Sequence, residues 1–123
     1  MEFVHTCYRI TDPERSVAFY EALGLEMRRE MPIREEATNY FLGVPGKPGP
    51  ELELTHNFGV GSYELGTAYG HIALTVEDMA ATLAELAEQG ITPERPPYTI
   101  REGGSQICFV RDPDNYRIEL IEH

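Results

Sequence analysis

The sequence predicts an α+β fold made of two βαβββ modules, and three observations lead to this prediction. Strand-like and helix-like patterns follow one another in the same order in each half of the 123 residues. The halves align without a gap when His5 is placed on His71, and the helix cap, helix stop and last strand then coincide. Polar and apolar side chains alternate along the strands, so each sheet has one face for a helix to cover. We expect one domain with modules at about 1–62 and 67–123.

The elements of the first module are read from periodicity and from capping residues. A strand is expected at Glu2–Ile10, where polar and apolar residues alternate. Thr11–Pro13 supplies an N-cap followed by a first-turn proline, and the helix that begins there ends at Gly24. Three more strands are expected, and a turn rich in proline and glycine separates the last two: Leu25–Met31, Thr38–Val44 and Glu51–Asn57.

The second module repeats this order. A strand is expected at Gly70–Val76, and Asp78 caps a helix that Gly90 ends. The remaining strands are expected around Ile91–Pro93, at Gln106–Val110 and at Tyr116–Glu122, the last one after the turn Asp112–Asn115.

Composition excludes several classes of protein. The chain carries 21 acidic and 10 basic residues, a formal net charge of −11, and a field of that sign repels phosphate backbones. No apolar run is long enough to span a membrane, and Met1 opens no signal-peptide pattern. We therefore expect a cytoplasmic protein that binds neither nucleic acid nor membrane. Its two cysteines, Cys7 and Cys108, are expected to be free thiols.

Two pairs of polar residues recur at the same spacing within the repeat. His5 precedes Glu53 by the same interval that separates His71 from Glu119, and apolar residues of opposite parity flank each of them. Side chains alternate between the faces of a strand, so all four can point to the side away from the helices. Two imidazoles and two carboxylates suit nickel, cobalt, iron, manganese or zinc. Taken singly, each of these residues is more often solvated or structural.

Other polar residues share the face of these pairs. Arg9 and Asn57 have the parity to reach a polar ligand, with Arg9 as a fork for a carboxylate. The alternatives are a surface ion pair for Arg9 and a strand-end role for Asn57. Cys7 would also face this side, but it is more easily read as a small buried filler than as a reactive thiol. Arg28-Arg29 and Arg101 are isolated basic spots that either meet an anionic ligand or are solvated.

The motifs together resemble those of glyoxalase I (lactoylglutathione lyase), in its short bacterial form, within the vicinal oxygen chelate superfamily. This resemblance covers essentially the whole chain. It is carried by the motifs His5–Ile10 with Ser16, Phe19-Tyr20 and Leu23–Leu25, then Glu51–Gly59, Tyr63–Ala73, Phe109–Asp114 and Ile118–Leu120.

The resemblance implies an activity and a set of roles. Enzymes of this family isomerise the hemithioacetal of methylglyoxal and glutathione to S-D-lactoylglutathione, by metal-assisted proton transfer through an enediolate. The metal ligands would be His5, Glu53, His71 and Glu119. Glu119 would be the catalytic base and Glu53 could share that role. Arg9, Asn57, His71 and Arg101 would contact the substrate.

The resemblance also implies a metal and an assembly. A histidine at the first ligand position, where zinc-type relatives carry glutamine, favours nickel, with cobalt next and zinc possible. Relatives are usually homodimers that share each site between subunits. His5 and Glu53 of one chain would then face His71 and Glu119 of the other.

Two departures and two alternative functions accompany the resemblance. Asn115 replaces a common glycine, a mild change because asparagine tolerates left-handed geometry. The basic residues that grip the glycyl carboxylate in longer relatives are not clearly matched, and Arg101 is a candidate for this role. The alternatives are a same-fold metalloenzyme, either an extradiol dioxygenase or a fosfomycin thiol transferase, and a non-catalytic protein that sequesters an antibiotic.

Overall fold

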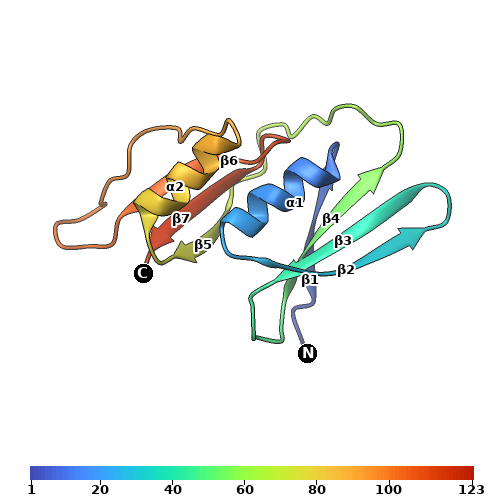
Figure 1. Ribbon diagram of the computed structural model, residues 1–123, viewed down its shortest axis with the longest axis horizontal. Helices are drawn as coiled ribbons and strands as arrows, with labels where there is room; N and C mark the ends of the chain where they lie inside the picture. The colour runs from blue at the N-terminus through green and yellow to red at the C-terminus, as the bar shows by residue number, and fades with distance from the viewer. The chain divides into compact units, whose positions relative to one another are not determined.

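The computed structural model describes residues 1–123, which form two compact units, Met1–Tyr63 and Glu64–His123 (Figure 1). Each unit contains one sheet and one helix. No helix in the chain is both long enough and apolar enough to cross a bilayer.

The first unit contains all five elements expected of a βαβββ module. Its sheet has the strand order β1-β4-β3-β2, in which β1 and β4 run parallel and the other neighbours run antiparallel. The first strand begins three residues later than expected, at His5. The elements are β1 (His5–Ile10), α1 (Pro13–Ala22), β2 (Glu26–Ile33), β3 (Ala37–Gly43) and β4 (Glu51–Asn57).

Helix α1 begins and ends where its capping residues predict. Asp12 is the N-cap, and its carboxylate accepts a hydrogen bond of 3.2 Å from the backbone N–H of Arg15. The chain leaves the helix through Gly24, whose φ of +106° favours glycine. Ser16, Phe19 and Tyr20 form the buried stripe of the helix, which packs against β2 and β3.

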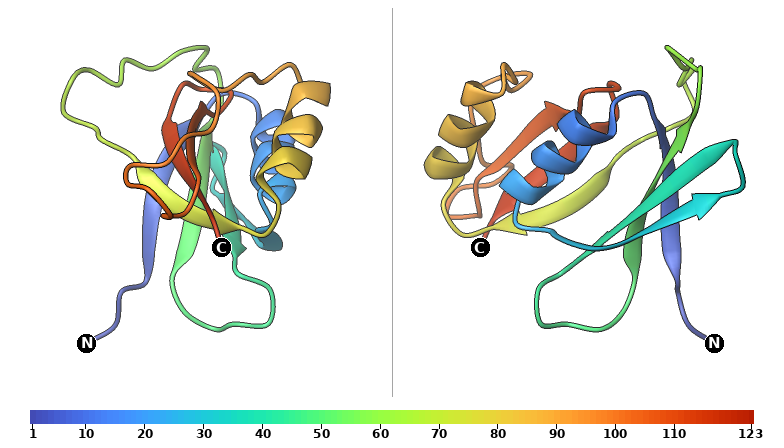
Figure 2. Two further views of the ribbon diagram at one scale, coloured as in Figure 1. Left: turned by 90° about the vertical axis from the view of Figure 1, so that its left-hand side faces the viewer. Right: turned by 45° about the vertical axis from the view of Figure 1, so that its right-hand side comes forward.

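The second unit has a sheet of three strands in the order β5-β7-β6, with β5 and β7 parallel and β6 and β7 antiparallel. Asp78 caps the helix through a 3.0 Å hydrogen bond from Ala81 N–H. Met79 and Leu86 are its buried residues, and the helix lies against one side of the strands (Figure 2). The elements are β5 (Ile72–Val76), α2 (Met79–Glu88), β6 (Ile107–Arg111) and β7 (Arg117–Glu122).

The strand expected around Ile91–Pro93 does not form, so the order in the second unit is βαββ. Three prolines, at positions 93, 96 and 97, remove backbone N–H donors that a strand would need. The only ladder contact of this segment is an isolated bridge between Tyr98 and Ile107. The repeat therefore predicts one strand too many here.

The turn between β6 and β7 explains why Asn115 is tolerated in place of glycine. Its φ is +76°, in the left-handed region that asparagine adopts more readily than most residues. The buried carboxylate of Asp112 accepts hydrogen bonds of 2.9 Å from the N–H groups of Asp114 and Tyr116. These contacts close the turn and set the start of β7.

The predicted division of each sheet into two faces is confirmed. In β1, Tyr8 and Ile10 are buried while His5, Cys7 and Arg9 are exposed. In β7, Ile118 and Leu120 are buried and Glu119 between them is half-buried. The polar set in each unit therefore lies on the sheet face opposite the apolar core.

Candidate metal centre

The first unit brings His5 and Glu53 into direct contact. His5 opens β1 and Glu53 lies at the centre of β4, beside it in the sheet. Nε2 of His5 is 2.7 Å from Oε2 of Glu53. The histidine side chain is 40% exposed and the glutamate side chain 11% exposed, so the pair opens to solvent on the imidazole side.

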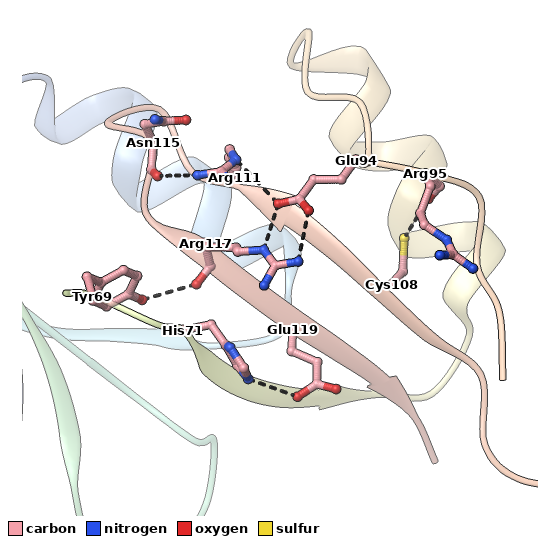
Figure 3. Close-up of polar contacts among 9 residues, drawn as sticks. All are labelled: Tyr69, His71, Glu94, Arg95, Cys108, Arg111, Asn115, Arg117 and Glu119. Atoms are coloured by element: carbon pink, nitrogen blue, oxygen red, sulfur yellow. Dashed lines mark hydrogen bonds and ion pairs between the residues drawn. The ribbon is translucent and has the colours of Figure 1, made fainter. Parts of the chain in front are cut away.

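The second unit brings together the matching pair, His71 and Glu119. His71 lies one residue before β5 rather than inside the expected strand, and Glu119 lies on β7. Nε2 of His71 is 3.3 Å from Oε1 of Glu119. Figure 3 shows the two side chains pointing toward each other from adjacent segments of the sheet.

Each pair offers one imidazole nitrogen and one carboxylate oxygen on the same sheet face. This mixed donor set fits a divalent first-row metal, for which imidazole and carboxylate are both suitable ligands. Within either unit the cluster stops at two residues: no group of three or more His, Cys, Asp or Glu side chains that could hold a metal occurs. A single unit thus supplies half of the predicted four-ligand set.

The histidine of each pair contacts a phenylalanine ring to which the sequence assigned no role in the site. Phe41 is the register partner of Glu53, and Phe109 is the register partner of Glu119. The ring of Phe41 meets His5 at 6.2 Å between centroids, and the ring of Phe109 meets His71 at 5.2 Å, both edge to face. Antiparallel register decides which residues are partners, and composition does not reveal it.

An arginine covers each of these phenylalanine rings. The guanidinium carbon of Arg29 lies 3.8 Å from the Phe41 centroid, and that of Arg117 lies 3.8 Å from the Phe109 centroid. Arg29 donates a 3.0 Å hydrogen bond to Glu51. Arg29 was read from the sequence as an isolated basic spot, so its stacking is a structural finding.

The Arg117 guanidinium is held by Glu94 through two hydrogen bonds, from Nε at 2.8 Å and from Nη2 at 3.0 Å (Figure 3). Nε of Arg111 is 3.3 Å from the same carboxylate. The hydrogen bond from Arg117, with the nearby Arg111 charge, holds the pKa of Glu94 below its usual range. In return, Glu94 raises the pKa of Arg117, which stays charged.

The expected substrate-facing residues of the first unit share the face of the His5–Glu53 pair. Arg9 is exposed on β1 beside Thr55, two residues before Asn57 on β4. Asn57 donates a 3.2 Å hydrogen bond to the hydroxyl of Tyr63. This arrangement leaves the Asn57 carbonyl oxygen turned away from that contact.

Cys7 also lies on this face, where it joins a polar chain. A hydrogen bond of 3.3 Å connects its Sγ with Oγ1 of Thr55, and Thr55 in turn donates to Oδ1 of Asn39 at 2.8 Å. Cys7 is exposed, so its interpretation as a buried filler is wrong, because its strand position faces away from the core. Cys108 is buried, and both cysteines are free thiols. Burial raises the pKa of the Cys108 thiol, so the thiol stays protonated and unreactive at neutral pH.

Arg101 lies in an exposed turn outside the sheet, closed by a 3.0 Å hydrogen bond from Gly104 N–H to its carbonyl oxygen. No contact ties its side chain to His71 or Glu119. Arg28 holds a different turn and donates to the carbonyls of Val44 and Lys47. Neither residue is placed at a His–Glu pair by the structure.

Comparison with known proteins identifies the family. The family described as the Glyoxalase/Bleomycin resistance protein/Dioxygenase superfamily matches residues 2–120. The chain belongs to this superfamily. The resemblance inferred from the motifs is thereby confirmed, and so is the α+β fold class.

Relatives within the superfamily include lactoylglutathione lyases. That of Haemophilus influenzae is 42% identical over 126 residues, which cover 100% of this chain and 93% of the relative. That of Arabidopsis thaliana is 40% identical over 127 residues, which cover 98% of this chain. The chain spans only 44% of this plant relative. The trypanothione-dependent glyoxalase I of Leishmania major superposes with a TM-score of 0.81 at 38% identity, over 99% of this chain and 86% of that one.

Proposed function

We propose that this chain is a glyoxalase I, which isomerises the hemithioacetal of methylglyoxal and glutathione to S-D-lactoylglutathione. The observation that carries the proposal is the pair of His–Glu contacts on matching strands, in a chain that aligns with bacterial lactoylglutathione lyases over nearly their whole length. A dioxygenase relies on two histidines and one carboxylate, so the second glutamate favours the lyase over that alternative.

His5, Glu53, His71 and Glu119 are the residues that would hold the metal. A divalent ion bound there supplies Lewis-acid stabilisation of the negative charge that develops on the substrate oxygens. Nickel is proposed first, because His5 stands where zinc-type relatives carry glutamine; cobalt comes next and zinc after it.

The protein's own groups carry the proton. The reaction removes a proton from a carbon next to a carbonyl and returns it to the neighbouring carbon, which requires a base that stays close to both. Glu119 suits this role because its side chain is only 16% exposed and lies against the imidazole of His71. Glu53, 11% exposed and paired with His5, can serve the same role on the opposite side.

Arg9 and Asn57 are proposed to bind the thiol portion of the substrate. A guanidinium fork matches a carboxylate, and an amide matches peptide groups. Both residues lie on the polar face of the first sheet. His71 and Arg101 were also expected to meet the substrate; Arg101, in its exposed turn, is the weaker of these two.

A homodimer with shared sites is proposed because each unit supplies only two of the four ligands. His5 and Glu53 of one chain would complete a site with His71 and Glu119 of its partner, in keeping with two-fold symmetry. Two free thiols suit a reducing compartment, so we propose that the protein is cytoplasmic.

The test is reconstitution of metal-free protein. Nickel, cobalt and zinc are added separately to the apoprotein, and the hemithioacetal is followed by its ultraviolet absorbance. We expect activity with nickel and cobalt and less with zinc. Activity with none of the three, in protein that binds the metal stoichiometrically, would contradict the proposed function. Catechol and fosfomycin serve as control substrates.

A further inference from the structure

We propose that Arg117 is a positioning residue for His71, and that it acts through the ring of Phe109. The proposal rests on the proposed function, because it treats His71 as a metal ligand. None of the motifs that carry the resemblance to glyoxalase I includes Arg117 or Glu94. What points to Arg117 is its place in a series of contacting side chains beside the His71–Glu119 pair. We call this series the column; it consists of His71, Phe109, Arg117 and Glu94.

The column can be followed contact by contact. The rings of His71 and Phe109 meet edge to face, with their planes at 84° and their centroids 5.2 Å apart. The guanidinium of Arg117 covers the Phe109 ring at 3.8 Å. Phe109 is 9% exposed, so these neighbours fill most of its surroundings. The orientation of the His71 ring therefore depends on where Phe109 is held.

Glu94 closes the column at its far end. Its carboxylate accepts both hydrogen bonds of the Arg117 fork, and its backbone N–H donates a 2.9 Å hydrogen bond to the carbonyl of Phe109. Arg111 adds a second positive charge to the same carboxylate at 3.3 Å. Arg117 is thus held at its edge by Glu94 and at one face by Phe109, which limits how far the ring can tilt.

The first unit contains the same sequence of contacts around His5. Phe41 meets His5, Arg29 covers Phe41, and Glu51 accepts a hydrogen bond from Arg29. That column is looser: its ring centroids are 6.2 Å apart, and the Arg29 side chain is 51% exposed against 35% for Arg117. Two independent occurrences beside the two histidines argue against chance stacking, and the tighter one makes the sharper test.

The second unit, which holds the Arg117 column, also offers a matched control. Arg95 covers the ring of Tyr98 at 3.6 Å, a stacking contact of the same kind and distance. The imidazole of His71 contacts the ring of Phe109 and makes no ring contact with Tyr98. Replacing Arg95 removes a stack of the same kind and keeps every side chain of the column, although Tyr98 itself interacts electrostatically with Arg117.

The experiment compares Arg117→Met, Arg117→Lys and Arg95→Met with the wild-type protein. The first readout is the imidazole ¹⁵N and ¹H resonances of His71 in the metal-free protein, assigned with a His71→Ala variant. The second is the dissociation constant for nickel, measured by competition with a chelator. The thermal midpoint of each variant controls for general loss of stability.

We expect Arg117→Met to shift the His71 resonances and to weaken nickel binding about tenfold, a typical effect for a group that orients a ligand. Lysine keeps the charge but lacks the planar fork, so Arg117→Lys should behave like the methionine variant. Arg95→Met should leave both readouts unchanged. His71 resonances unchanged in Arg117→Met, wild-type behaviour of Arg117→Lys, or an equal effect of Arg95→Met would each overturn the proposal.

Failure of the proposed function would look different. Wild-type protein that binds neither nickel nor cobalt would contradict the assignment of the metal site. The His71 resonances of the metal-free variants would still show whether Arg117 orients the imidazole.

Discussion

Among single residues, Glu94 has the most clearly defined electrostatic surroundings, with two guanidinium groups on one carboxylate. The pKa of Glu94 is lowered from its ordinary 4.5, chiefly by the hydrogen bond from Arg117. A carboxyl whose pKa is lower in the folded than in the unfolded chain adds stability above its unfolded pKa. That contribution is lost as the pH falls through the folded pKa.

This predicts a pH dependence that can be measured by urea unfolding. At neutral pH the Glu94→Gln variant should unfold at lower urea concentration than the wild type. The difference in free energy of unfolding should begin to shrink as the pH falls below about 4.5, where Glu94 of the unfolded chain takes up a proton, and should be lost once the pH passes the lowered pKa of the folded chain. A difference that stays constant from pH 7 to pH 3 would show that the charge of Glu94 does not stabilise the fold.

At this scale the sequence predicts the polar pairs but not their supports. His5, Glu53, His71 and Glu119 stand out because strand parity and equal spacing are visible in the sequence. Phe109 and Arg117 become neighbours of His71 only through the register of β6 on β7, which side-chain pattern alone leaves open. The fork between Arg117 and Glu94 further requires a loop conformation that composition does not specify.

Among the elements, β2 shows how one extra residue sets the direction of two side chains. The ladder between β2 and β3 shifts register between Met27 and Arg29, so Arg28 is the bulged residue. Arg29 then covers Phe41, while Arg28 donates to the carbonyls of Val44 and Lys47 at 2.7 and 2.6 Å. The bulge therefore places Arg29 over Phe41 and directs Arg28 to the turn that joins β3 to β4.

Gly43 makes room for Arg28, and this predicts the effect of an added methyl group. A Cβ at Gly43 would clash with Cζ of Arg28, so the guanidinium would have to leave the turn. We expect Gly43→Ala to lower the free energy of unfolding by about 1–2 kcal/mol, through loss of hydrogen bonds from a charged group. Arg28→Met is the control, and in the double variant the two effects should not add. Full additivity would rule out displacement of Arg28 as the cause.

The helices and most strands could be predicted from local signals, and the segment after α2 could not. Asp12 and Asp78 cap the two helices because their carboxylates accept bonds from the first turn, a purely local property. The Ile91–Pro93 strand was expected from weak strand signals together with the symmetry of the repeat. The prolines at positions 93, 96 and 97 cannot donate backbone hydrogen bonds to a ladder. The segment therefore forms no strand, although the corresponding segment of the first unit does.

For the whole molecule, the division into two units of about equal length matters more than the net charge of −11. Each unit carries one histidine and one glutamate in contact, and neither gathers three ligands. With that net charge, the proposed anionic substrate would have to be attracted locally, by groups such as Arg9, against an unfavourable overall field. The proposed dimer accounts for how two half-sites become one site.

Sharing of sites between subunits predicts complementation between two inactive variants. His5→Ala and His71→Ala should each lack activity. When the two are unfolded together and refolded, a mixed dimer has one site with both substitutions and one with neither. Since about half the dimers are mixed, about a quarter of wild-type activity should return. No recovery, in a mixture shown to contain mixed dimers, would mean that each site forms within one chain.

The most direct measurement of the central claim, that Glu119 moves the proton in a metal-dependent isomerisation, is turnover by Glu119→Gln with its metal content determined. Glu88→Gln, an exposed substitution on α2, is the matched control and should keep wild-type turnover. Glutamine keeps the shape and an oxygen donor but cannot accept the proton, so we predict a loss of at least about 100-fold in kcat. Near-wild-type turnover by metal-loaded Glu119→Gln would contradict the claim.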